Sequence, residues 1–252
     1  MHNDAGAGAR RPSISVVIPA LNEEKLLRGI LQQFTPDLLD RHRIELIVSD
    51  GGSLDKTCSI AREFGAKIVE NPAGIKQTIS IGRNAGAERA QGTILVFLNA
   101  DTAVPEIDMF FRRILDEMAE PGICAVTCSV RVYPAEESLA DVLFHGFYNW
   151  FFYMMNRVGM AMGRGECHVI TREAFDAVGG YSGGIAAGED YDMFRRLSRV
   201  GRIRFLRDVV VHESPRRYRK YGYLYVTLSW FLNFLSVFFL GRSILNQWKP
   251  VR

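Results

Sequence analysis

The sequence predicts an α/β fold in which helices flank a mainly parallel sheet. In the first half of the chain, four short apolar runs rich in β-branched residues alternate with segments of helical periodicity. Successive strand–helix units of this kind form parallel sheets. The 252 residues are 48% hydrophobic and 23% charged, which excludes a disordered or fibrous chain and allows one large core. No linker rich in proline, serine or charge separates the halves, so one continuous domain is the simpler interpretation.

The first half is expected to hold four strand–helix units. Strands are predicted at 14–18, 44–48, 67–70 and 93–98, with helices following them at 22–34, 55–64, 77–90 and 105–119. Pro19 closes the first strand, and Asn22 is a candidate cap for the first helix. The carboxyl ends of the four strands are therefore expected at one edge of the sheet.

The second half is less regular. Strands are predicted at 123–130, 168–170, 203–206 and 208–212, and helices at 138–160, 172–178 and 190–200. The first dozen residues lack periodicity and are rich in glycine and alanine, which is typical of a mobile leader. The expected organisation is a leader over 1–12, an α/β domain over 13–213, and a basic, aromatic helical segment over 214–252.

Cysteine usage and charge indicate the compartment and the partners. Cys58, Cys124, Cys128 and Cys167 form no Cys-x-x-Cys pair and no signal peptide opens the sequence, which favours a reducing cytoplasm and argues against zinc. The net charge is +3, but residues 201–252 carry +8 and residues 1–200 carry −5. A positive surface of this kind attracts nucleic acid, anionic lipid or a phosphorylated ligand.

The loops after the first, second and fourth strands are the candidate site, because ligands of open parallel sheets bind beyond the carboxyl ends of the strands. They read Pro19-Ala-Leu-Asn-Glu23, Ser49-Asp-Gly-Gly-Ser53 and Asn99-Ala-Asp101. No Gly-x-Gly-x-x-Gly follows the first strand, and no P-loop motif occurs in the sequence. These absences argue against a dinucleotide-dependent dehydrogenase and a P-loop NTPase.

Five motifs in a consistent order and spacing carry a family resemblance. They are Ser15-Val-Val-Ile-Pro-Ala-Leu-Asn-Glu23, Val48-Ser-Asp-Gly-Gly-Ser-Leu-Asp55, Gly82-Arg-Asn-Ala-Gly86, Phe97-Leu-Asn-Ala-Asp-Thr102 and Gly188-Glu-Asp190. Together they resemble family 2 glycosyltransferases with the GT-A fold, over about residues 13–213. The resemblance implies transfer of a sugar, expected to be a hexosyl group, from a UDP- or GDP-sugar. It also implies a divalent cation and inversion at the anomeric carbon.

By this resemblance, the first two loops hold the base and ribose of the donor. The matching residues are Pro19, Leu21, Glu23 and Asp50. The alternative for the second loop is a plain turn in which Ser53 caps the next helix and Asp55 is favoured by the helix dipole. We assign Ser53 and Asp55 to that turn, and Asp50, at the strand end, to the ligand.

The diphosphate requires cationic groups, and the resemblance places a metal beside it. Asp101 is the expected ligand of Mn²⁺ or Mg²⁺, since these cations take carboxylate oxygens and leave positions open for phosphate. The sequence departs from the usual Asp-x-Asp by having Asn99 at the first position. Asn99 is expected to contribute to donor binding, since it keeps hydrogen-bonding capacity for the ribose or a metal-bound water but loses a charge. His212 matches a metal-binding histidine of several family members, and capping of a strand end is its alternative role.

Three arginines are candidates for the diphosphate. Arg83 lies in the segment that approaches the diphosphate in the family, and Arg216 and Arg217 are expected to close over it from the other side. The alternative for Arg216 and Arg217 is a solvated basic face.

Asp190 matches the general base of the family, with Glu189 helping to orient the site. An inverting displacement at a hydroxyl acceptor needs a carboxylate to take the proton. A helix N-terminus lowers the pKa of Asp190 and the adjacent Glu189 raises it, so the sequence leaves the balance open. A structural cap at the start of helix 190–200 is the competing role for Asp190.

Residues 223–240 form an uncharged stretch of eighteen residues, borderline in length for a membrane span. Thr227, Ser229, Asn233 and Ser236 interrupt it, and four basic residues precede it at 216, 217, 219 and 220. This combination favours a helix lying on an anionic membrane surface, with a core or dimer helix as the alternative. We therefore expect a cytoplasmic protein, peripheral at the inner face of the cell membrane.

The expected partners are a nucleotide-sugar donor and a glycan or lipid-linked acceptor such as a polyprenyl phosphate, and not nucleic acid. Two other functions stay open at this point. A nucleotidyltransferase normally carries a glycine-rich loop with a basic residue directly after the first strand, and here no basic residue precedes Lys25. A non-catalytic, membrane-associated module that binds sugar nucleotides would keep the loops and dispense with Asp190.

Overall fold

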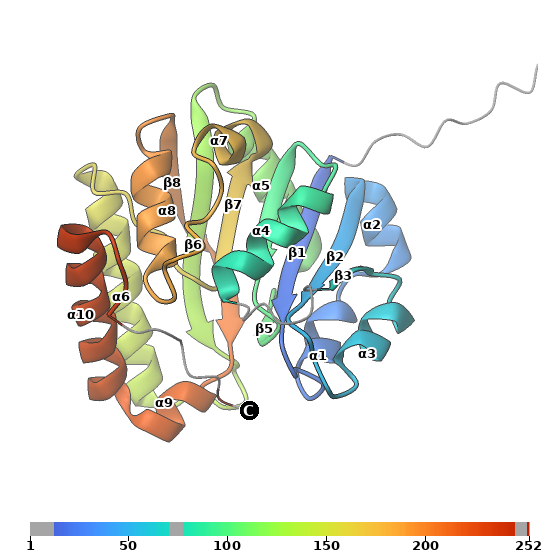
Figure 1. Ribbon diagram of the computed structural model, residues 1–252, viewed down its shortest axis with the longest axis horizontal. Helices are drawn as coiled ribbons and strands as arrows, with labels where there is room; N and C mark the ends of the chain where they lie inside the picture. Colours follow the sequence, from blue (N-terminus) through green and yellow to red (C-terminus); the bar gives the residue numbers. More distant parts are fainter. Residues whose placement is uncertain (1–12, 71–77, 245–250, 252) are drawn as a thin grey trace, which may run out of the picture.

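The computed structural model describes residues 13–70, 78–244 and 251, and the strands in it form one sheet (Figure 1). The strands are β1 (Ile14–Ala20), β2 (Ile44–Asp50), β3 (Lys67–Glu70), β4 (Ile94–Leu98), β5 (Thr102–Ala103), β6 (Ile123–Val132), β7 (Cys167–Thr171) and β8 (Arg202–Glu213). Their order across the sheet is β3-β2-β1-β4-β7-β6-β8-β5. The first four strands pair in parallel, as do β6 and β8, which confirms the predicted mainly parallel α/β sheet.

β7 is inserted into the sheet in the opposite direction. It pairs antiparallel with β4 on one side and with β6 on the other. Because β7 runs backwards, its first residue lies at the edge where the parallel strands end. The residues just before it, 163–166, are thereby brought to the edge of the sheet that carries the candidate loops.

The helices cover both faces of the sheet. They are α1 (Leu27–Leu31), α2 (Pro36–His42), α3 (Thr57–Glu63), α4 (Ile79–Arg89), α5 (Ile107–Met118), α6 (Leu139–Arg157), α7 (Arg172–Ala177), α8 (Glu189–Leu197), α9 (Arg216–Tyr221) and α10 (Tyr223–Leu240). Apolar side chains of α1, α2, α3 and α5 share one buried cluster with the sheet, and those of α4, α7 and α8 share another. Two clusters on opposite faces are what a three-layer α/β fold requires.

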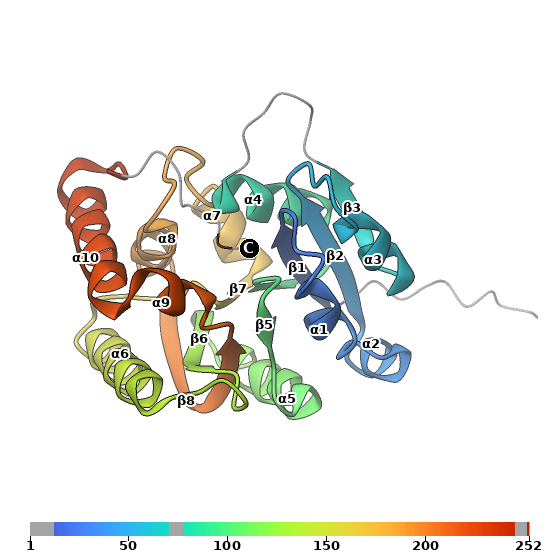
Figure 2. The same cartoon turned by 90° about the horizontal axis from the view of Figure 1, so that it is seen from below.

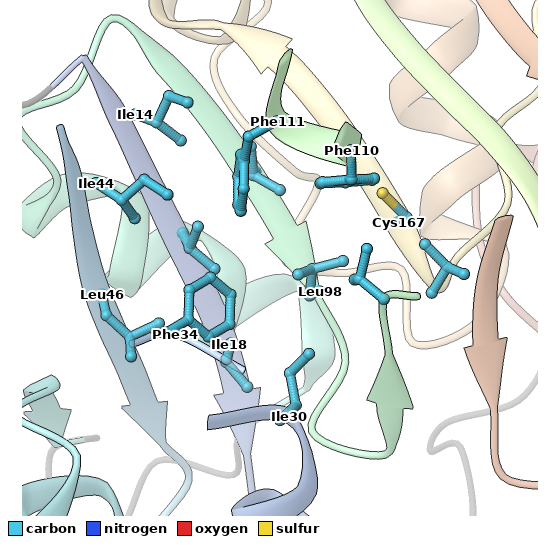
Figure 3. Packing of buried hydrophobic residues seen from close by; sticks show 14 of the residues in the cluster. Ile14, Ile18, Ile30, Phe34, Ile44, Leu46, Leu98, Phe110, Phe111 and Cys167 are labelled. Atoms are coloured by element: carbon cyan, nitrogen blue, oxygen red, sulfur yellow. The ribbon is translucent and has the colours of Figure 1, made fainter. Parts of the chain in front are cut away.

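The larger cluster fixes the positions of the strand ends. Figure 3 shows Ile14 and Ile18 of β1 and Leu98 of β4 in one buried cluster with Phe34, Phe110 and Phe111. Burying a side chain of this size contributes about 1.5–3 kcal/mol. The loops that follow β1, β2 and β4 therefore start from rigid points.

The helices that follow β1 and β2 begin later than the sequence pattern indicates. The helix expected at 22–34 begins at Leu27, and Asn22 has a left-handed φ of 53° and caps nothing. A separate α2 follows, capped by Thr35, whose Oγ1 accepts a hydrogen bond from Leu38. The helix expected at 55–64 begins at Thr57. The later starts leave both loops after β1 and β2 long enough to contact each other.

The strands predicted at 203–206 and 208–212 are one strand, β8. Its pairing with β6 slips between Cys128 opposite Leu206 and Ser129 opposite Val210, which leaves residues 207–209 as a bulge. The hydroxyl of Ser129 donates to the carbonyl of Arg207 and holds the bulge. The polar pair at 207–208 thus sits in the bulge and leaves the strand continuous.

The C-terminal segment packs along α6. Phe144 and Tyr148 of α6 contact Trp230 of α10, with ring centroids 5.9 and 5.4 Å apart, and both views show the two helices at the same flank of the molecule (Figures 1 and 2). Arg219 of α9 forms an ion pair with the fully buried Asp141 of α6 at 2.5 Å. The expected leader, residues 1–12, lies outside the described residues.

Candidate active site

The loops after β1 and β2 are joined by reciprocal hydrogen bonds. The backbone N–H of Asn22 donates to Oγ of Ser53 at 2.8 Å, and the N–H of Leu54 donates to Oδ1 of Asn22 at 2.8 Å. Ser53 therefore holds a loop and is not the helix cap that the sequence indicates. The half-buried Pro19 and Leu21 lie in this joined region, Pro19 directly opposite Ser49 of β2.

Asp50 is buried at the end of β2 with one oxygen in use. Its Oδ2 accepts hydrogen bonds from the N–H groups of Gly52 and Ser53, both at 2.9 Å, which accounts for the tight turn. Its Oδ1 is buried and has no hydrogen-bond partner. An unpaired buried oxygen is costly, so a carboxylate in this state is suited to a donor from a bound ligand.

Arg216 joins two residues of the candidate donor site. Its guanidinium donates to both carboxylate oxygens of Glu23, at 3.0 and 2.9 Å, and lies 2.9 Å from Oδ2 of Asp101. Burial acts against the charge of Arg216, but these carboxylates raise its pKa above the ordinary value. Residues 23, 101 and 216 come from three distant parts of the sequence and meet at one point.

The backbone of Asp101 is held so that its carboxylate faces two arginines. The hydroxyl of Tyr133 and the N–H of Ser214 both donate to the carbonyl of Asp101, at 2.7 and 3.1 Å. Burial lowers the pKa of Arg217, while the charge of Asp101 acts in the opposite direction. The arrangement presents one carboxylate and two guanidinium groups at the end of β4.

The described residues suit a metal that is bound together with a diphosphate. Across residues 13–70, 78–244 and 251, no group of three His, Cys, Asp or Glu side chains lies close enough to hold a metal ion. Asp101 is partly exposed and offers hard oxygens of the kind that Mn²⁺ and Mg²⁺ prefer. A cation on one carboxylate needs further oxygen ligands, which a diphosphate can supply.

His212 and Glu213 lie on opposite faces of β8. It pairs with Arg131 in the β6–β8 ladder and with Ala103 on β5. Burial, followed by the charge of Arg131, lowers its pKa, and Glu137 is the acidic group that acts against this shift. The next residue, Glu213, has Asp101 among its charged neighbours. Since successive side chains of a strand alternate between faces, His212 points to the other side of the strand.

Arg83 is buried and serves as an internal clamp. Its guanidinium donates to Oε1 of Glu189 at 3.1 Å, to Oδ1 of Asn99 at 3.2 Å and to the carbonyl of Gly165 at 2.5 Å. Only 1% of its side chain is exposed, and it lies 5.2 Å from the ring of Tyr181. Reaching a diphosphate would break all of these contacts, so Arg83 connects Asn99 to the Glu189 loop.

Asp190 is the half-buried carboxylate beside this clamp. Gly188, with a left-handed φ of 83°, occupies the N-cap position of α8, and Oδ1 of Asp190 accepts one hydrogen bond from the N–H of Tyr191. Asp190 is therefore not the cap of the helix. Burial, followed by the negative charge of Glu189, raises its pKa to about 7. A carboxylate with this pKa is suited to accept a proton near neutral pH.

A buried polar cluster lies beside the site, and the sequence patterns did not predict it. Arg164 lies 3.4 Å from Glu166, 3.4 Å from Nδ1 of His145 and 3.8 Å from Glu213. The hydroxyl of Tyr218 in α9 donates to Glu213 at 2.8 Å, which anchors the helix that carries Arg216. The sequence signal for this cluster is Arg164-Gly165-Glu166, which directly precedes the short apolar strand β7. These residues can be placed at the site only when β7 is known to run antiparallel.

These features define a class of protein. The sheet carries two joined loops after β1 and β2, a carboxylate beside arginines after β4, and a second carboxylate with a raised pKa on α8. This is the layout of a GT-A protein. The model of the family "Glycosyl transferase family 2" matches residues 15–179, and the chain belongs to that family.

Relatives in sequence are themselves named as glycosyltransferases. A probable glycosyltransferase, YdaM, of Bacillus subtilis (strain 168) is 26% identical over 222 residues, covering 81% of this chain and 51% of the relative. The 4,4'-diaponeurosporenoate glycosyltransferase of Staphylococcus haemolyticus is 39% identical over 98 residues, covering 37% of this chain and 25% of the relative. The chain thus spans about half or less of the length of these relatives.

Solved structures share the fold. A mannosyltransferase from Pyrobaculum calidifontis, in complex with GDP-Man and Mn²⁺, matches with a TM-score of 0.63 and 22% identity, over 84% of this chain and 59% of that one. Glucosyl-3-phosphoglycerate synthase from Mycobacterium tuberculosis, with Mn²⁺, UDP and glucosyl-3-phosphoglycerate, matches with a TM-score of 0.62 and 20% identity, over 91% and 79%. At these identities the likeness establishes the GT-A-like fold.

Proposed function

We propose that this protein is an inverting glycosyltransferase that moves a sugar, most simply a hexose, from a nucleotide-diphosphate sugar to an acceptor. The observation that carries the proposal is the pairing of two sites at one sheet edge. One side holds Asp101 with Arg216 and Arg217, and the other holds Asp190 with a pKa raised to about 7. The positive groups beside Asp101 suit a leaving diphosphate, and the carboxylate of Asp190 suits an attacking hydroxyl that must lose its proton.

The donor nucleotide is assigned to the loops after β1 and β2. Pro19 and Leu21 line the nucleotide, and the unpaired Oδ1 of Asp50 accepts a hydrogen bond from the base or ribose. Arg216 releases Asp101 and turns to the diphosphate while Glu23 keeps hold of the same guanidinium. Guanidinium groups are well suited to phosphate oxygens because their donors form a planar fork.

A divalent cation, Mn²⁺ or Mg²⁺, would neutralise the charge that develops on the leaving diphosphate. Asp101 is the residue assigned to hold it. Asn99 accepts a hydrogen bond from Arg83, and its neutral amide adds no negative charge next to the cation. The protein's own contribution to the leaving group is the pair Arg216 and Arg217.

The reaction is a single displacement. The acceptor oxygen forms a bond to the anomeric carbon, the bond from that carbon to the diphosphate oxygen breaks, and the nucleoside diphosphate leaves with the electron pair. The proton of a hydroxyl acceptor passes to Asp190, while an ionised phosphate acceptor has no proton to lose. Glu189, held by Arg83, keeps the start of α8 in place.

The substrates are proposed at the level of class. Solved structures of similar fold contain GDP-Man or UDP, so we propose a GDP- or UDP-sugar as donor. The acceptor is a glycan or a lipid-linked molecule such as a polyprenyl phosphate. We further propose that the protein works in the cytoplasm, at the inner face of the cell membrane.

The test is donor turnover by the purified chain. UDP- and GDP-sugars with Mn²⁺ should give slow release of UDP or GDP and a free sugar even without acceptor, and Asp190→Asn should lower acceptor-dependent turnover by about 10²- to 10⁴-fold. Asp176→Asn, on an exposed carboxylate of α7, is the matched control and should turn over normally. Formation of UTP or GTP and sugar 1-phosphate when pyrophosphate is added would indicate a nucleotidyltransferase, and donor binding without turnover would indicate a non-catalytic module.

A further inference from the structure

α6 and α10 pack side by side and both expose large apolar side chains. The large apolar side chains that these two helices expose are Leu139, Val142, Leu143, Phe147, Trp150, Leu224, Tyr225, Leu228, Phe231, Leu232, Phe238, Phe239 and Leu240. We call this set the α6–α10 face. A soluble monomer rarely exposes an apolar patch of this extent, and such patches mark binding surfaces.

Two of the four polar residues of α10, Asn233 and Ser236, lie against the protein, while Thr227 and Ser229 are half-buried. Asn233 and Ser236 are buried, and Nδ2 of Asn233 donates to the carbonyl of Ser229 while Oγ of Ser236 donates to that of Arg242. Phe234 packs on Tyr191 of α8 with centroids 4.6 Å apart. The helix is long and apolar enough to cross a membrane, but one side is held along the protein body and the other is apolar. This geometry is that of a helix lying in an interface.

The exposed charges carried by α6, α9 and α10 themselves are all positive, and the exposed Glu136 lies in the loop before α6. The only carboxylate on α6, α9 or α10 is that of Asp141, which is fully buried against Arg219. Exposed cations lie at the helix ends: Arg157 is the last residue of α6, Lys220 precedes α10 and Arg242 follows it. A second copy of this face would bring no carboxylate to these cations. An anionic lipid headgroup pairs with them directly.

We infer that the α6–α10 face docks on an anionic lipid bilayer, with α10 lying along the bilayer surface. Two of the basic residues before α10 already have carboxylate partners within the protein. Arg216 pairs with Glu23 and Asp101, and Arg219 pairs with Asp141. Docking therefore depends mainly on the apolar side chains and on the cations at the rim. Binding should depend on salt only in part.

α10, which carries part of the docking face, packs against the start of α8, where Asp190 lies. A Cβ at Gly188 would come 3.3 Å from Val237 of α10, so α10 packs against the residue that starts α8. This last step rests on the proposed function: the acceptor is an amphiphile that stays in the bilayer and presents its hydroxyl or phosphate to Asp190. Docking itself needs no catalytic activity, so the two ideas fail separately.

The experiment is flotation of the full chain with vesicles of phosphatidylcholine alone and of phosphatidylcholine with phosphatidylglycerol at 3:1. Wild-type protein should float with the anionic vesicles at low salt and less with the neutral ones. Phe231→Glu should weaken this binding at least tenfold. Met109→Glu on α5, where the residue is 56% exposed against 55% for Phe231, is the matched control and should bind as wild type.

Four outcomes would overturn the inference. These are no flotation with anionic vesicles at low salt, equal losses in the two glutamate variants, retention in cell membranes through high salt and alkaline carbonate, and a dimer that Phe231→Glu dissociates. Retention would mean a span, and the dimer would mean a second copy on the face. If Asp190→Asn floats normally while wild type turns over no donor, the proposed function fails and the docking inference stands.

Discussion

Arg216 and Arg83 are both paired with carboxylates at the candidate site, but their surroundings differ. Arg216 has 23% of its side chain exposed and contacts Glu23 and Asp101, whereas Arg83 has 1% exposed and contacts Glu189, Asn99 and a backbone carbonyl. A partly exposed arginine can exchange a carboxylate for a phosphate because water satisfies the groups during the exchange. A sealed arginine leaves a buried charge unpaired if it moves.

The difference indicates that ligand binding can rearrange the ion pairs around Arg216 but not those around Arg83. The Asp101 side is a set of partly exposed charges that a ligand can rearrange, and the Asp190 side is a buried, hydrogen-bonded frame around a carboxylate with a raised pKa. Removing each arginine should therefore have unlike consequences, and the following experiments separate them.

The largest expected effect is the loss of stability in Arg83→Gln. Removing one partner of a buried pair typically costs about 3–5 kcal/mol, since Glu189 keeps its charge without a partner. Arg216→Gln should cost less, because the Arg216 side chain is 23% exposed and water can reach the carboxylates that it leaves. Urea unfolding of the two variants against wild type measures the difference, and equal losses would show that both arginines belong to the same rigid frame.

The next effect is on metal-dependent binding. Asp101→Ala should remove the Mn²⁺-dependent part of UDP or GDP binding, a loss of about tenfold or more, and leave the melting temperature nearly unchanged. Asp116→Ala, at an exposed carboxylate of α5, is the control. Calorimetric titration with and without Mn²⁺ decides it. Unchanged metal dependence in the Asp101 variant would remove this residue from the metal site.

A smaller effect is expected in the pH profile. Asp190 must be ionised to accept a proton, so kcat/KM should rise with pH through about 7, the raised pKa of Asp190. Glu189→Gln removes a charge that raises this pKa, and the rise should then occur at lower pH. A rise at the same pH in wild type and variant would show that another group is titrated.

The same pKa predicts a trend in stability. Between the ordinary pKa of an aspartate, about 4, and about 7, the folded protein holds a proton on Asp190 that the unfolded chain has lost. The contribution of Asp190 to the free energy of unfolding therefore falls as the pH rises through this range. Asp190→Asn should flatten the dependence, which thermal unfolding across pH 4–8 can measure.

The smallest effect is that of Arg216→Lys. Lysine keeps the charge but loses the two-pronged contact with Glu23, so the affinity for UDP or GDP should fall only about threefold. Thermal shift titration measures it. A loss as large as that of Arg216→Gln would mean that the geometry of the guanidinium, and not its charge, holds the diphosphate.

Much of the fold follows from short-range patterns. The alternation of apolar strands and periodic helices predicts β1 to β4 and the edge at which their loops meet, because each crossover connection constrains its two strands. Ser138 and Asp141 form a capping box at the start of the helix predicted from residue 138. The motif Gly188-Glu-Asp190 likewise places two carboxylates at the start of one helix, since adjacency in sequence is adjacency in space.

Other features depend on the direction of a strand and on which face of the sheet each side chain occupies, and local sequence patterns do not determine either. The antiparallel insertion of β7 brings Arg164 and Glu166 to the edge of the site, although they precede a strand. His212 and Glu213 are neighbours in sequence on opposite faces of β8, so the register of that strand decides that Glu213 has Asp101 as a charged neighbour.

The sequence by itself determined the family, the sheet, and the chemical types gathered after each strand, because these depend on residues near one another along the chain. Only the tertiary structure decided the partner of each charge. Arg216 pairs with Glu23 across 193 residues and Arg219 with Asp141 across 78, so two of the four basic residues that precede α10 are engaged inside the protein. An ion pair forms wherever folding brings opposite charges within a few ångströms, and sequence separation places no limit on that distance.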